Sequence, residues 1–190
     1  GDVYKRQFDN TSVLRPTPGY PSQKRPAGSV RDVTVGLPPG FIGNPTAVGE
    51  CVAVQLTTGS CPPSSMVGRF DGIVYSPLAG RFWTLSYPIF NMSHPNGVVS
   101  DLAFAPVGAP VHIRASLDPT NQYAIETTTP NIPEIVPVFT TKVAIWGVPG
   151  ERSHDSVRCP SQGPIEGTAK ECPTDSERPV SYTHLRAHET

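Results

Sequence analysis

Charged side chains are scarce in this chain: Asp, Glu, Lys and Arg make up 16% of its 190 residues, and the formal net charge is −1. A nucleic-acid-binding surface needs clustered Lys and Arg, which this composition does not supply. No segment approaches the roughly 18 consecutive apolar residues that a membrane-spanning helix requires. The sequence therefore predicts no nucleic-acid partner and no membrane span in this fragment.

Long amphipathic helices are also lacking, whereas turn-forming residues are abundant, with 23 Pro and 17 Gly. Short segments with alternating polar and apolar residues lie between the turns, as expected of strands. The strands are predicted at residues 29–35, 66–75, 81–87, 98–105, 111–117, 123–129 and 141–146. Residues 52–56 fit one helical turn or a strand equally well.

Two of these segments define the expected sheet. Asn96-Gly97 is a strong hairpin signal, because both residues tolerate the positive φ of a type I′ turn. In residues 111–117, apolar side chains alternate with polar ones from Val111 to Leu117, as in a sheet with one buried and one wet face. We therefore expect an all-β fold, an antiparallel β-sandwich of immunoglobulin-like or jelly-roll-like type, over residues 28–150.

Only four cysteines are present, and they form two local pairs, Cys51 with Cys61 and Cys159 with Cys172. Structural zinc sites bring in ligands about two to four residues apart, so neither pair fits one. Local disulfides that staple loops fit better, and disulfides persist in oxidising compartments. The sequence thus favours an extracellular or cell-surface protein, the alternative being four reduced cysteines in a cytosolic one.

The two ends of the chain encode one another backwards. Residues 2–7 can be encoded by GATGTGTATAAGAGACAG, whose reverse complement, read from its third base, encodes Val-Ser-Tyr-Thr-His, the sequence of residues 180–184. This relation resembles the inverted transposon ends of sequencing libraries. We interpret residues 1–7 and 180–190 as translated adapter, which is excluded from fold reasoning. We expect both to pack against nothing native.

Three further segments follow from that interpretation. Residues 8–27 are predicted to be an extended, truncated lead-in, interrupted by Pro16, Pro18, Pro21 and Pro26. Residues 28–150 are the sandwich domain, and residues 151–179 are an irregular loop closed by the second disulfide. The native part is then an internal piece of a longer chain, whose neighbouring domains are its expected partners.

Catalytic chemistry is not predicted. Ser153-His154-Asp155 does not make a triad, because triad members converge in space and three successive residues cannot; we expect His154 at a loop surface. His112 is expected on the wet face of its strand and His94 beside the hairpin turn, neither with metal-ligand spacing. No cofactor or metal site is predicted. A hydrolase would need one of these histidines within about 3–4 Å of a nucleophile or carboxylate.

Two weaker signals concern carbohydrate. Four aromatic residues could form a stacking platform for a sugar ring if they share one exposed face, the alternative being core packing. They are Trp83, Tyr87, Phe90 and Tyr123. Asn10-Thr11-Ser12 and Asn91-Met92-Ser93 match the glycosylation acceptor pattern, which is common by chance.

An ordered set of short motifs runs through most of residues 28–155. The motifs are Pro38-Pro39-Gly40, Gly43-Asn44-Pro45, Cys51, Cys61-Pro62, Trp146-Gly147-Val148-Pro149 and Ser153-His154-Asp155. The set resembles an uncharacterised family of large secreted bacterial surface proteins. The resemblance implies surface location and multidomain context, often beside immunoglobulin-like modules, and implies no catalytic role. Ile42 departs from the usual Val of that family.

The leading hypothesis is a non-catalytic structural or adhesive module of a secreted or cell-surface protein. A carbohydrate-binding module, with a cell-surface glycan as ligand, is the alternative, and a hydrolase is the third.

Overall fold

Antiparallel strands make up most of the computed structural model, which describes residues 2–9, 14–17, 20–26, 28–41, 43–76, 81–94, 98–134 and 138–158. The strands are β1 (Asp2–Asp9), β2 (Leu14–Thr17), β3 (Tyr20–Pro26), β4 (Val33–Gly36), β5 (Met66–Ser76), β6 (Arg81–Met92), β7 (Ser100–Phe104), β8 (Val111–Asp118), β9 (Ala124–Thr129) and β10 (Val138–Trp146). The helical segments are η1 (Pro45–Ala47), α1 (Ala53–Thr58), η2 (Pro63–Ser65), η3 (Pro106–Gly108), η4 (Arg152–His154) and α2 (Asp155–Arg158).

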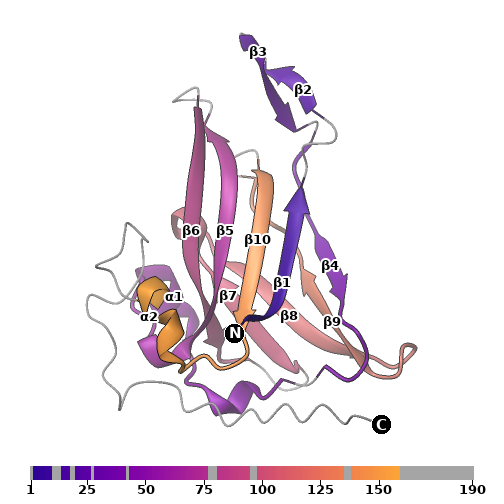
Figure 1. Ribbon diagram of the computed structural model, residues 1–190, viewed down its shortest axis with the longest axis vertical. Coiled ribbons are helices and arrows are strands. Elements are labelled where there is room, and N and C mark those ends of the chain that lie inside the picture. The colour runs from indigo at the N-terminus through magenta and orange to yellow at the C-terminus, as the bar shows by residue number, and fades with distance from the viewer. Residues whose placement is uncertain are drawn as a thin grey trace.

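Eight strands form one sheet in the order β1-β10-β5-β6-β7-β8-β9-β4, and β2 pairs with β3 in a separate hairpin. The sheet curls into a half-barrel. In Figure 1, β6, β5, β10 and β1 run along the long axis while β7, β8 and β9 cross behind them. The all-β antiparallel class predicted from the sequence is confirmed, with one curled sheet in place of two separate layers.

The sheet bends toward a face that is filled by apolar side chains. Phe70 of β5 pairs with Tyr87 of β6, and residues directly opposite one another share a face. Phe70 also stacks on Phe104 of β7, across the intervening β6, with ring centroids 4.4 Å apart. This concave cluster contains Val67, Phe70, Tyr87, Ile89, Phe104 and Val111. Burial of these side chains is the main favourable term that holds the curvature.

A second apolar cluster covers the opposite face at one end of the sheet, where α1 packs in Figure 1. Its members are Cys51, Leu56, Cys61, Met66, Phe90, Met92, Ala103 and Trp146. Leu56 is the buried residue of α1 and is only 5% exposed. The cluster therefore joins α1 and its flanking loops to strands β5, β6, β7 and β10.

The undecided segment after Cys51 is the short helix α1. The Gln55 side chain accepts a hydrogen bond from the backbone N–H of Val52 at 3.1 Å, which satisfies one of the donors exposed at a helix start. Gly59 ends the helix at φ +67°, and its N–H donates to the carbonyl of Leu56 at 3.3 Å. Glycine suits this position because it adopts left-handed dihedrals without a steric penalty.

Several predicted strands are confirmed with shifted ends. The strand expected at residues 29–35 begins only at Val33, and β6 extends to Met92. Asn96 and Gly97 lie outside the described residues, but the two strands that they join pair antiparallel, as expected. Leu117 was expected on the buried face of β8 and is 47% exposed, because the concave cluster does not extend beyond Ile113 along this strand.

The expectation that residues 1–7 pack against nothing native is wrong for the described strand β1. Asp2–Asp9 pairs antiparallel with β10, from Asp2↔Trp146 to Asp9↔Thr140. Backbone hydrogen bonds need only an extended chain and an unpaired strand edge, so they form with little regard to side chains. Residues 180–190 lie outside the described residues.

Candidate functional site

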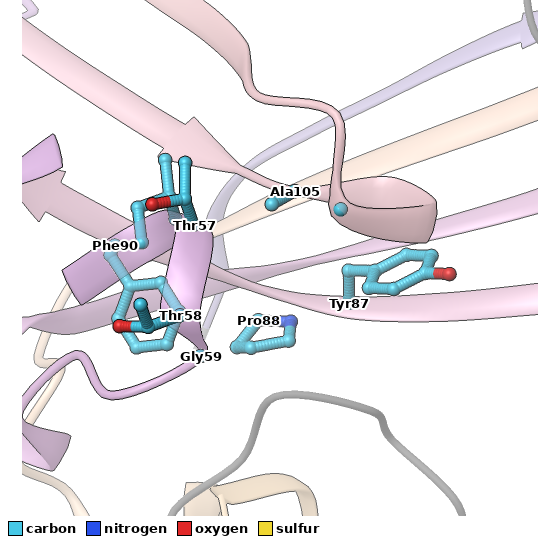
Figure 2. Close-up of a pocket in the computed structure, with 9 residues that line it drawn as sticks. Thr57, Thr58, Gly59, Tyr87, Pro88, Phe90 and Ala105 are labelled. Carbon is cyan, nitrogen blue, oxygen red and sulfur yellow. The ribbon is translucent and has the colours of Figure 1, made fainter. Parts of the chain in front are cut away.

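An open groove lies between α1, β6 and η3, with a volume of about 220 Å³. Its lining consists of Leu56, Thr57, Thr58, Gly59, Tyr87, Pro88, Phe90, Ala105 and Gly108. Figure 2 shows the threonines of α1 on one side and the side chains of Tyr87, Pro88 and Phe90 along β6. Ligand pockets for drug-sized molecules enclose about 300–1,000 Å³, so this groove suits a smaller group or part of a larger ligand.

The two threonine hydroxyls that line the groove are hydrogen-bonded within the helix. The Thr58 hydroxyl donates to the carbonyl of Val54 at 2.8 Å, and the Thr57 hydroxyl lies 3.0 Å from the same carbonyl oxygen. Because each hydroxyl has one proton, these bonds leave only acceptor lone pairs toward the groove. Beside these threonines the groove offers the ring and proline surface of Tyr87, Pro88 and Phe90, which suits recognition by shape.

A disulfide fixes α1 beside this groove. Cys51 and Cys61 are bonded, as predicted, with Cα atoms 5.2 Å apart. Cys51 is 0% exposed and Cys61 is 8% exposed, so the sulfur atoms lie within the apolar cluster beneath the helix. A cross-link over so short a loop stabilises the fold by about 2.5–3 kcal/mol in the chain-entropy description. The second predicted pair, Cys159 and Cys172, lies outside the described residues.

The structure does not bring the four candidate platform aromatics onto one exposed face. Tyr87 and Phe90 are each 6% exposed and belong to the two different apolar clusters. Trp83 is 45% exposed near the start of β6. Tyr123 is 68% exposed in the turn before β9, at φ +55°. Tyr87 and Phe90 are core residues whose edges line the groove, so only Trp83 and Tyr123 keep the exposure that a platform requires.

His112 has a carboxylate partner that the sequence did not reveal. Its Nδ1 lies 2.9 Å from Oδ2 and 3.0 Å from Oδ1 of Asp101, which is 6% exposed. The two residues come from neighbouring strands, where Ala103 pairs with His112 and Asp101 with Arg114. The sequence carried a usable signal, because the hairpin register places both residues on one face. The distance between the His112 ring and the Asp101 carboxylate is within the limit of about 3–4 Å that a hydrolase would require.

His154 is buried, so its expected place at a loop surface is wrong. Its imidazole is 7% exposed and stacks on the indole of Trp146, with centroids 4.2 Å apart and planes 5° apart. Its Nε2 lies 3.9 Å from Oε2 of Glu151, beyond hydrogen-bond range. Sequence could not predict this placement, because it depends on the turn that returns η4 onto the last residue of β10.

Asn91, the second candidate glycosylation acceptor, is 1% exposed. Its amide nitrogen donates to the carbonyls of Pro45 and Gly49 at 3.0 and 3.2 Å. Oligosaccharide transfer needs an accessible amide, so the folded chain cannot be modified at Asn91. The side chain instead ties the loop before Cys51 to β6. The other acceptor, Asn10, lies outside the described residues.

Two further findings concern the described residues as a set. They contain no cluster of three or more His, Cys, Asp or Glu side chains with the arrangement of a metal site. None of their helices combines the length and the apolar character needed to cross a membrane.

His94, which was expected beside the hairpin turn, lies two residues after the end of β6 and is half-buried.

Comparison with known proteins adds no relative. No protein-family model, curated protein or solved structure matches this chain.

Proposed function

We propose that the chain is a non-catalytic structural or adhesive module of a secreted or cell-surface protein, held among further segments of the same longer chain. The observation that supports this best is the Cys51–Cys61 disulfide, sealed in an apolar cluster against the sheet. Disulfides of this kind persist where the environment is oxidising.

The buried polar groups support a structural role as well, because two of them join separate segments and a third closes a local turn. Asn91 holds the loop before Cys51, and the Ser65 hydroxyl donates to the carbonyl of Pro62 at 2.7 Å. Asp101 is paired with His112 across two strands. Buried polar groups bonded in this way specify one arrangement of the chain, and their removal leaves partners unsatisfied.

The compartment is tested by exporting the chain and comparing it with the Cys51→Ala/Cys61→Ala variant. The exported protein should carry no free thiol at either position, and the variant should lose about 2.5–3 kcal/mol of unfolding free energy from the missing loop closure alone. Equal stability of the two proteins in urea unfolding would contradict the proposal that the module depends on an oxidising environment.

The absence of catalysis is tested at the Asp101–His112 pair. Wild type and His112→Asn are incubated with generic ester, peptide and glycoside substrates. We expect no turnover above background for either protein. Turnover that disappears in the His112→Asn variant, while circular dichroism shows an unchanged fold, would establish the hydrolase and overturn the proposal.

A carbohydrate-binding module is the second candidate, favoured by the ring surface of the groove and by exposed Trp83. A glycan array with wild type, Thr58→Trp and Trp83→Ala separates the two places. Thr58 is exposed at the groove, so a tryptophan there fills the groove without entering the core. If only Thr58→Trp loses binding, the glycan binds in the groove. If only Trp83→Ala loses binding, the glycan binds at the start of β6. No binding by wild type removes this candidate.

A further inference from the structure

The loop that joins β8 to β9 carries backbone strain that glycine would remove. The two strands end where Asp118 pairs with Ala124. The N–H of Ala124 donates to the carbonyl of Asn121 at 2.8 Å, which closes a turn around Gln122 and Tyr123. These two central residues have φ of +52° and +55°. Positive φ at both positions is the geometry of a type I′ turn, in which Asn and Gly are preferred and a bulky side chain is strained.

The strained turn presents an aromatic side chain to solvent. Tyr123 is 68% exposed, the highest value among the large apolar side chains that the structure describes. Glycine at this position would adopt the same dihedrals without a steric penalty. Strain that the rest of the loop holds in place is typical of functional sites.

The first half of the loop holds the turn in its shape. The carboxylate of Asp118 accepts hydrogen bonds from the N–H and the hydroxyl of Thr120, at 2.9 and 2.6 Å. The N–H of Asn121 donates to the carbonyl of Asp118 at 3.2 Å. Tyr123 therefore projects from an ordered turn, and preorganisation of this kind lowers the entropic cost of binding a partner.

The side chains beside the ring supply hydrogen bonds without charge. Asn121 and Gln122 are exposed, and their side-chain amides make no hydrogen bond within the part of the chain that the structure describes. Each amide offers two donors and one acceptor oxygen. From Ser116 to Glu126 the chain contains no Lys or Arg. A negatively charged ligand would therefore find no cation on this loop.

We propose that the tip of the β8–β9 hairpin is a binding site for a neutral pyranose, which stacks on Tyr123 and receives hydrogen bonds from Asn121 and Gln122. A pyranose ring has an apolar face of C–H groups that packs on an aromatic ring, and its hydroxyls bond to amides. This inference rests on the proposed function, because it names the ligand class that an adhesive module would hold. It uses neither the groove nor Trp83.

The test is a glycan array probed with the full chain, displayed in several copies on streptavidin so that weak single contacts add up. The array carries neutral glycans beside sialylated and uronic-acid glycans. Wild type should bind the neutral glycans. Tyr123→Phe should keep the signal within about threefold because the ring remains, and Tyr123→Gly should lower it by about tenfold or more.

Trp83→Ala is the matched control, because Trp83 is an exposed aromatic residue at the start of β6 and should leave binding unchanged. Binding confined to acidic glycans, binding that Tyr123→Gly retains, or no binding at all would overturn the proposal. None of these results bears on the thiol measurement of the exported chain, so a failure here is distinct from failure of the proposed function.

Thermal unfolding of the same variants tests the strain itself. Tyr123→Gly should raise the Tm by about 2–4 °C, because glycine adopts φ +55° without strain, and Tyr123→Phe should leave it within about 1 °C. A variant that gains stability while it loses binding cannot owe the loss to misfolding. A lower Tm for Tyr123→Gly would contradict the inference that the strain is retained for the tyrosine ring.

Discussion

The stacked rings of Phe70 in β5 and Phe104 in β7 allow a test of whether the sheet bends toward the concave cluster. Phe104 is 5% exposed and stacks on Phe70 with an interplanar angle of 19°. Replacement of a buried phenylalanine by alanine removes both its transfer free energy and its contacts, so Phe104→Ala should cost about 3–5 kcal/mol. The size of this loss reflects a site walled by three strands, which cannot collapse easily around a smaller side chain.

Phe82→Ala is the matched control, because Phe82 is an aromatic strand residue that is 50% exposed and makes edge contacts with Tyr75 and Phe139. About half of a phenylalanine's burial is at stake there, so the expected cost is about 1–1.5 kcal/mol. The assay is urea unfolding at fixed pH, with slopes compared so that midpoints report stability.

A double-mutant cycle with Phe70→Ala isolates the contact itself. Stacked aromatic pairs contribute about 0.5–1.5 kcal/mol beyond their area, so the double variant should lose less than the two single variants combined by about that amount. Additive losses would mean that Phe70 and Phe104 do not touch. The account of a sheet bent toward this face would then be refuted.

Two further predictions concern single positions. A Cβ on Gly68 would lie 2.3 Å from the carbonyl oxygen of Ala144, so Gly68→Ala should destabilise the fold by about 1–3 kcal/mol in thermal unfolding, whereas Gly36→Ala, with open space around it, should change it by under about 0.5 kcal/mol. The side-chain hydrogen bond from Thr120 lowers the pKa of Asp118, so this carboxylate stabilises the fold above its unfolded pKa and loses that contribution as pH falls through the lower, folded pKa. Thr120→Val should raise the pKa of Asp118 toward its ordinary value in an NMR titration, and an unchanged pKa would contradict the assignment.

Local chemistry made much of the fold predictable. Alternation along residues 111–117 predicted β8, and the short spacing of Cys51 and Cys61 predicted their bond. These features depend on neighbours in sequence, where side-chain period and loop closure act directly. The same reasoning left α1 undecided, because a six-residue helix depends on tertiary packing of Leu56 more than on its own propensity.

The candidate site was less predictable because curvature and coverage are long-range properties. Alternation placed Leu117 on the apolar side of β8, but no sequence period states how far along a strand the covering cluster extends. The groove needs α1 and η3 to meet over Pro88, and the stacking of His154 on Trp146 needs a return turn. The Asp101–His112 pair was within reach, because it follows once the hairpin register is fixed.

The most direct test of the account is a non-reducing peptide map of the exported chain. Protease cleavage between Cys51 and Cys61, followed by mass spectrometry with and without reductant, should release a cross-linked pair of peptides that joins these two residues. Free thiols at both positions would contradict a disulfide-stapled module of the cell exterior, and a cross-link from either one to Cys159 or Cys172 would contradict the pairing on which the account of α1 rests.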